Sequence, residues 1–172
     1  MFLKRFKEKS NQKYINKVLS DRNTSVNGDK IKSVAIILNH DEFHDFEVFK
    51  NYLKELNLNA PKHKIIAFSA DKNSEHSTWD TYFNPKDFGW RGKILNPDLE
   101  TFINRNFDVL ISYYKEDVLE LNLIAAASKA NFKVGISRRD ERMYDLIIDV
   151  SPDEISTFKN ELKKYLNILN KL

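Results

Sequence analysis

Five short runs of consecutive apolar residues constrain the fold of this 172-residue chain more than any other feature. Continuous runs rich in β-branched residues are typical of strands that are buried on both faces of a parallel sheet. We expect strands at residues 33–38, 64–69, 107–112, 132–136 and 146–150. Segments with apolar residues at helical spacing lie between or after them, at residues 45–56, 96–105, 117–130 and 151–170. This alternation predicts an α/β fold with a single doubly wound, mostly parallel five-stranded sheet, Rossmann- or flavodoxin-like.

The direction of the fifth strand is the open point in this topology. Only nine residues, 137–145, connect the fourth and fifth strands, whereas a parallel crossover usually needs a dozen or more. A short irregular crossover and an antiparallel fifth strand both fit this length. We favour a parallel strand, because Ser151 followed by Glu154 is a capping-box signature and the helix that it starts continues the alternation.

The beginning of the chain differs from the rest in charge. Residues 1–32 hold nine Lys or Arg and three acids, a net charge of +6, while the remaining 140 residues carry −3. Apolar residues at helical spacing over residues 3–20 predict an amphipathic helix. We therefore divide the chain into a basic N-terminal helix (1–22), a polar linker (23–32) and an α/β domain (33–172). An uncompensated basic segment favours an acidic or polyanionic partner.

Residues 70–95 form an aromatic-rich segment without a clear helical or strand period. It contains both tryptophans, Trp79 and Trp90, together with several cations such as Arg91. Two interpretations fit this composition. The aromatic side chains fold back as a lid over the sheet edge, or they form an interface for a partner.

Polar side chains follow the expected strands at the sheet edge where open α/β folds bind their ligands. His40 and Asp41 follow the first strand, Tyr113 the third and Arg138 the fourth. These four residues are the candidate ligand-binding residues. Polar residues also follow buried strands for a simpler reason, since the chain turns there in solvent.

Several kinds of chemistry lack their sequence motifs. The chain has no Cys and therefore no thiolate ligand or thiol nucleophile, and it has only four Gly. Neither GxGxxG nor GxxxxGK[ST] follows the first strand, and GxSxG does not occur. His40 and His44 lie four residues apart, but not in the HExxH order. We predict no metal site and no cofactor, and, without a membrane span or a signal sequence, a cytoplasmic protein.

Several phrases resemble an uncharacterised conserved bacterial domain family of unknown function. They are FLKRF, ILNHDEF, DFGWRGKI, FDVLISYY and SKANFKVGI. The resemblance covers nearly the whole chain and implies an α/β fold with no established activity. A weaker likeness, carried by FDVLIS, SKA, FKVGIS and LIIDV, is to the N-terminal half of heptosyltransferase-type glycosyltransferases. It implies the same topology, although the second, donor-binding domain of those enzymes has no counterpart in this sequence.

We expect a non-catalytic α/β interaction module that binds a macromolecular partner, a protein or a ribonucleoprotein. The candidate partner-binding residues belong to the basic helix and the aromatic segment: Lys4, Arg5, Lys7, Trp79, Trp90 and Arg91. No DNA-specific motif is present, and membrane-surface contact is not expected. The alternative is a small-ligand-binding or glycosyltransferase-like enzyme that uses the carboxyl ends of the strands.

Overall fold

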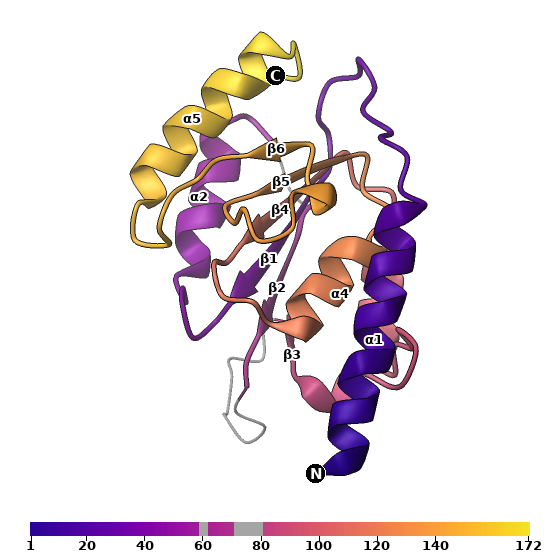
Figure 1. Ribbon diagram of the computed structural model, residues 1–172. Coiled ribbons are helices and arrows are strands. Elements are labelled where there is room, and N and C mark those ends of the chain that lie inside the picture. Colours follow the sequence, from indigo (N-terminus) through magenta and orange to yellow (C-terminus); the bar gives the residue numbers. More distant parts are fainter. Residues whose placement is uncertain (59–61, 71–80) are drawn as a thin grey trace.

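A computed structural model describes residues 1–58, 62–70 and 81–172. In these residues the chain forms one open, all-parallel sheet of six strands in the order β3-β2-β1-β4-β5-β6 (Figure 1). The strands are β1 (Val34–Asn39), β2 (Lys64–Phe68), β3 (Thr81–Phe83), β4 (Val109–Tyr113), β5 (Phe132–Gly135) and β6 (Leu146–Ile147). The helices are α1 (Phe2–Ser20), α2 (Phe46–Glu55), α3 (Pro97–Asn104), α4 (Leu119–Ala127) and α5 (Ile155–Ile168), with short 3-10 helices at Pro85–Asp87 and Glu141–Met143.

The prediction of five strands is wrong, because β3 lies within the segment that we expected to be a loop. It consists of three residues and pairs with β2 alone, Ile66 opposite Thr81 and Phe68 opposite Phe83. A three-residue strand at the sheet edge is too short to show a periodicity in the sequence. The structure confirms the parallel direction of the last strand, since β6 pairs with β5 through Val134 and Leu146.

The central strand β1 is buried along its whole length, as its continuous apolar run predicts. Ile36 and Leu38 face one hydrophobic cluster, and Ala35 and Ile37 face the other. A strand with both faces covered needs helices on both sides of the sheet. The helices α2 and α5 cover the first face, and α3 and α4 cover the second (Figure 1).

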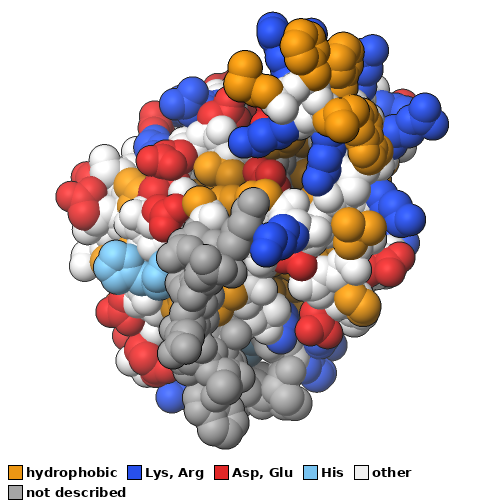
Figure 2. All heavy atoms as spheres, turned by 90° about the horizontal axis from the view of Figure 1, so that it is seen from below, with side chains coloured by type: hydrophobic (Ala, Val, Ile, Leu, Met, Phe, Trp, Pro, Cys, Tyr) orange, Lys and Arg blue, Asp and Glu red, His pale blue; other side chains and the backbone are white. Residues whose placement is uncertain are grey.

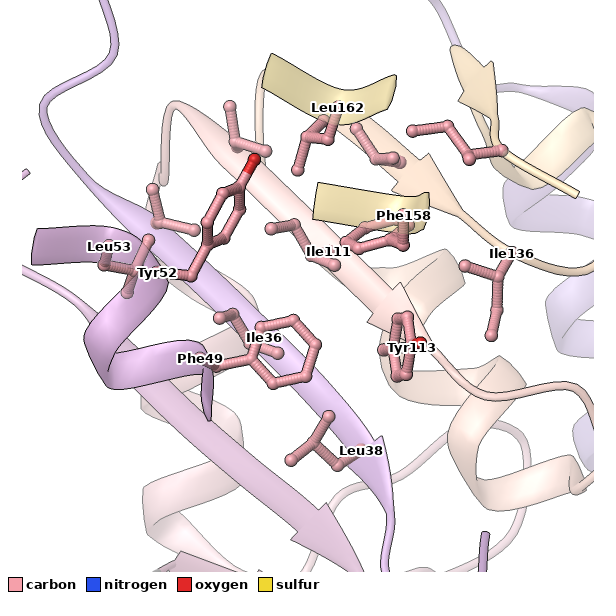
Figure 3. Packing of buried hydrophobic residues seen from close by; sticks show 14 of the residues in the cluster. Ile36, Leu38, Phe49, Tyr52, Leu53, Ile111, Tyr113, Ile136, Phe158 and Leu162 are labelled. Carbon is pink, nitrogen blue, oxygen red and sulfur yellow. The ribbon is translucent and has the colours of Figure 1, made fainter. Parts of the chain in front are cut away.

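Aromatic and aliphatic side chains pack together in the first cluster (Figure 3). Phe49 of α2, Tyr113 of β4 and Phe158 of α5 lie with ring centroids 4.9–6.5 Å apart. These edge-to-face contacts join α2 and α5 to each other and to β4 on this face of the sheet.

One helix start has the cap chemistry that its residues favour, and one differs from its prediction. Asn96 accepts a hydrogen bond from the Asp98 amide and Pro97 opens α3. The last helix begins at Ile155 instead of at Ser151. Glu154 does accept from the Ser151 amide (2.7 Å), but this bond closes a turn ahead of the helix.

Candidate functional site

The second half of α1 is docked on the body of the protein. Asn11, Ile15 and Leu19 are buried and lie four residues apart, on one side of the helix. Ile15 and Leu19 pack into the second hydrophobic cluster. Figure 1 shows α1 lying beside α4. Beyond the helix, Arg22 donates through Nη2 to Asp145 Oδ2 (2.7 Å) and through Nη1 to the Arg142 carbonyl (3.1 Å). The predicted N-terminal helix is therefore part of the folded body from about Ser10 onward.

A turn of the aromatic segment, residues 89–92, is bound directly to α1. The Asn11 amide group donates to the Gly89 carbonyl (3.0 Å) and accepts from the Gly92 amide (2.9 Å). The Arg91 amide donates to Ser10 Oγ (3.1 Å). The two segments that we expected to contact partners separately thus form one structural unit.

One part of the aromatic segment is buried like a lid, and another part is exposed as an interface would be. Phe83 and Phe88 are buried in the second cluster, as a lid over the sheet would be. Trp90 is 47% exposed, and Arg91 beside it is exposed as well. Trp79 lies outside the described residues. Among the described aromatic residues of the segment, Trp90 is the one suited to contact a partner.

The first half of α1, which we call the α1 tip (residues 1–9), extends past the body (Figure 1). Phe2, Leu3 and Phe6 are 79%, 75% and 57% exposed. Figure 2 looks onto this end of the molecule and shows exposed hydrophobic side chains among Lys and Arg. The predicted partner residues Lys4, Arg5 and Lys7 all belong to this tip; Lys4 and Arg5 are exposed and Lys7 is partly exposed.

The carboxyl ends of β1 and β4 meet where the strand order reverses, which is where open α/β sheets bind ligands. Here the carboxylate of Glu42 takes hydrogen bonds from the protein itself. Its Oε2 accepts from the Lys115 amide (2.7 Å), and its Oε1 accepts from the Glu116 amide and the Asn39 side chain (both 2.9 Å). The backbone N–H groups that an anionic ligand would use at this position are bound to Glu42.

The four candidate ligand-binding residues lie in different surroundings. The half-buried ring of His40 packs against those of His44 and Tyr82, with centroids 5.4 Å away in both cases, and Asp41 is exposed. The buried hydroxyl of Tyr113 donates to the Pro152 carbonyl (2.9 Å), and burial raises its pKa. Arg138 donates through Nε to Asp149 Oδ2 (2.9 Å).

Asp149 connects two of the strand ends. Its carboxylate also binds Lys115 Nζ, which donates to the Ile136 carbonyl (2.8 Å). The two cations lower the pKa of the Asp149 carboxyl, chiefly through the hydrogen bond from Lys115. Arg138 is therefore part of an ion-paired cluster on the surface.

A cavity of about 250 Å³ lies between α1 and the carboxyl ends of β4 and β5. Tyr114, Asn122, Arg139 and Tyr144 line it, together with Gln12 of α1, and none of the four candidate residues does. Tyr114 lines the cavity, whereas its neighbour Tyr113 was the residue predicted to bind a ligand. Successive residues of a strand face opposite sides, so Tyr113 joins the α5 side and Tyr114 the α1 side. That alternation was the signal available in the sequence.

In residues 1–58, 62–70 and 81–172, no three His, Asp or Glu side chains gather as a metal site would require. No helix in these ranges has the length and apolar character needed to cross a membrane.

A family model described as "Family of unknown function (DUF6913)" matches residues 7–169. No curated protein and no solved structure matches the chain. The weaker likeness to heptosyltransferases therefore gains no support from these comparisons.

Proposed function

The chain belongs to the DUF6913 family of unknown function, and from its geometry we propose that it is a non-catalytic interaction module whose α1 tip inserts into an acidic, apolar-lined groove of a protein partner. The single observation that carries this proposal is the exposure of three large apolar side chains within two helical turns, those of Phe2, Leu3 and Phe6. Contiguous exposed apolar patches on a folded protein mark interaction sites. An apolar helix face with anchors three and four residues apart is typical of helix-in-groove recognition.

The direction of these side chains supports a partner outside the body. Nine residues, or about two and a half turns, separate Phe6 from the buried Ile15. Phe6 therefore points to the opposite side of α1 from the docked stripe. Leu3 and Ser10 are seven residues apart and share a side, and Ser10 holds the turn that carries Trp90. The turn that carries the exposed Trp90 therefore lies on the Leu3 side of α1.

The charges around the tip favour an acidic rim on the partner. Lys4, Arg5, Lys7 and Lys9 surround the apolar anchors, and within the tip only Glu8 opposes them, through an exposed pair with Lys4 at 3.9 Å. Complementary charge at the rim of an interface raises the association rate and selects the partner. The strength of membrane-surface binding scales with the apolar area that is buried, and three side chains supply little of it. We therefore favour a protein.

The sheet supports a role without dinucleotide chemistry. The order β3-β2-β1-β4-β5-β6 is the order of doubly wound Rossmann sheets, and we propose that this fold is a relative of that arrangement. In a dinucleotide-binding sheet the first turn carries a glycine-rich loop for the phosphates. In this chain Glu42 occupies that turn and binds the amides after β4.

A photo-crosslinking phenylalanine analogue tests the proposal when it replaces Phe6 in the native cells. A matched control carries the analogue in place of Ile168, which is 68% exposed on α5. We expect a discrete protein crosslinked from position 6 and absent from position 168. The charge reversals Lys4→Glu and Lys7→Glu should weaken this crosslink, while Lys163→Glu on α5 should leave it unchanged. Crosslinks to RNA or lipid at position 6, equal products at both positions, or no product would contradict the proposal.

A further inference from the structure

We infer that the cavity between α1 and the ends of β4 and β5 binds a small, neutral polyhydroxylated molecule, such as a monosaccharide. This site is separate from the α1 tip. The cavity lies beyond the carboxyl ends of parallel strands, on the side of the sheet edge where such folds bind ligands. Its volume of about 250 Å³ is below the range of drug-sized pockets, roughly 300–1,000 Å³, and suits a smaller ligand.

Two tyrosine hydroxyls on the inner wall of the cavity are joined to each other and to Asn122 by long hydrogen bonds. The Tyr144 and Tyr114 hydroxyls are 3.4 Å apart, and the Tyr114 hydroxyl donates to Asn122 Oδ1 at 3.3 Å. Bonds between hydroxyl groups are usually 2.5–3.0 Å long. Tyr114 is only 2% exposed, whereas Tyr144 is partly exposed and lines the cavity. A poorly paired polar group is a cost to the fold, and a ligand hydroxyl in the cavity would relieve it at Tyr144.

The state of these hydroxyls suits a ligand that both donates and accepts. Burial raises the pKa of the Tyr114 and Tyr144 hydroxyls, so both stay protonated at neutral pH. A tyrosine hydroxyl donates through its proton and accepts through its oxygen. Ser112, on the same side of β4 as Tyr114, is fully buried beside the two tyrosine hydroxyls. The interior beside the cavity is thus rich in hydroxyl groups.

The outer lining opposes an anionic ligand. Glu116, Asp117 and Asp140 contribute carboxylates, and Arg139 contributes one guanidinium. Arg142 forms an ion pair with Asp140, with Nη2 and Oδ2 2.7 Å apart. The other charged side chains of the rim, Glu116, Asp117 and Arg139, carry a net charge of about −1. A phosphate would meet these acids without a matching cluster of cations. Alternating acceptors and donors fit the hydroxyl groups of a neutral polyol.

The two methionines of the chain provide a direct test. Met143 lines the cavity and is buried, whereas Met1 is fully exposed at the start of α1. We would label both methyl groups with ¹³C and titrate the full-length protein with D-glucose, D-ribose and myo-inositol, using methylammonium and inorganic phosphate as charged comparisons. We expect at least one polyol to shift the Met143 resonance saturably while the Met1 resonance stays in place.

Two variants connect the response to the hydroxyl wall. Tyr144→Phe keeps the ring that packs over Gly135 and removes only the hydroxyl. It should weaken polyol binding about three- to tenfold, the effect of one neutral hydrogen bond. The control Tyr165→Phe, on α5 outside the cavity, should bind as the parent does. A Met143 signal that stays unshifted by all three polyols, that responds only to the charged compounds, or that titrates equally in Tyr144→Phe would overturn the inference.

Discussion

Gly92 lies against the ring of Tyr14 so closely that a Cβ atom at position 92 would be 2.2 Å from Cδ1 of that ring. Its φ of +75° also belongs to the left-handed region that side chains disfavour. The residue therefore meets two requirements at once, a turn after Arg91 and a close contact with α1. This contact joins the aromatic segment to the N-terminal helix.

Replacing Gly92 with Ala should destabilise the protein by at least about 2 kcal/mol, because strained backbone and overpacking add together. Urea unfolding would measure the loss. In a Tyr14→Ala background the same change should cost less, since the ring is gone while the strain remains. Gly28→Ala is the control, as nothing lies within 4 Å of its Cβ position. Equal losses at positions 92 and 28 would show that the contact is unimportant.

Arg22 should stabilise the docking of α1 through Asp145. The Asp145 side chain is 4% exposed, and its Oδ2 accepts from both Arg22 and the Lys133 amide. Arg22→Met leaves this carboxylate buried without its charged partner, which should cost about 3 kcal/mol. Chemical denaturation measures the cost. Lys4→Met removes an exposed pair and should change stability by less than about 0.5 kcal/mol. A similar effect of both variants would contradict this role of Arg22.

Lys133 should make stability depend on pH above neutrality. Its amine is buried on β5 and donates to the Ala125 and Ala126 carbonyls at the end of α4. Burial lowers the pKa of this amine from 10.5 to about 7, with the charge of Arg22 adding to the effect. Between pH 7 and about pH 10 the unfolded chain therefore binds a proton that the folded chain does not. Stability contributed by this group rises with pH across that window, and below pH 7 the full cost of a buried charge is present.

The measurable sign is the slope of unfolding free energy against pH. Lys133→Met should lower this slope by up to about 1.4 kcal/mol per pH unit within the window, the effect of one proton. The absolute stability of this variant will also change, because the Ala125 and Ala126 carbonyls lose their hydrogen-bond donor. The slope is therefore the quantity to compare. Lys129→Met, at an exposed position, should keep the parent slope. Parallel curves for the parent and Lys133→Met would refute the prediction.

Glu42 should matter for stability more than its partly exposed position suggests. Its two oxygens accept three hydrogen bonds, two of them from the backbone after β4. Glu42→Gln replaces one acceptor with a donor and should cost about 1–3 kcal/mol, since a backbone N–H is left facing an N–H. Thermal unfolding would detect this as a lower Tm. Asp41→Asn, exposed next to it, should have almost no effect, and a comparable drop in Tm there would argue against the bridging role.

The strands were predictable where burial is continuous. The runs at Val34–Asn39 and Val109–Tyr113 are apolar because both faces are covered, and the pattern expresses that directly. The edge strand β3 escaped prediction because three residues paired on one side leave no periodic pattern. The start of α5 was misplaced because the Ser151–Glu154 pair closes a turn as readily as it caps a helix.

The candidate site was less predictable than the fold. Residue type and position after a strand selected His40, Asp41, Tyr113 and Arg138, but whether a side chain lines a cavity depends on which face it takes. Tyr113 and Tyr114 are chemically alike and adjacent, and only the second reaches the cavity. Trp90 was recognised as unusual from composition, yet its exposure follows from the packing of Phe83 and Phe88 beneath the same segment.

By itself the sequence determined the parallel α/β sheet and the basic N-terminal helix, because periodicity and charge are local properties of the chain. The tertiary structure decided that α1 is docked on the body from Ser10 onward and that its first nine residues extend away from the body. Asn11 meets Gly89 and Gly92 across about eighty residues of sequence, and hydrogen bonds between such distant residues leave no periodic trace. It also decided that α1 closes a cavity beside Tyr114 and Tyr144, since a cavity exists only where separate elements meet.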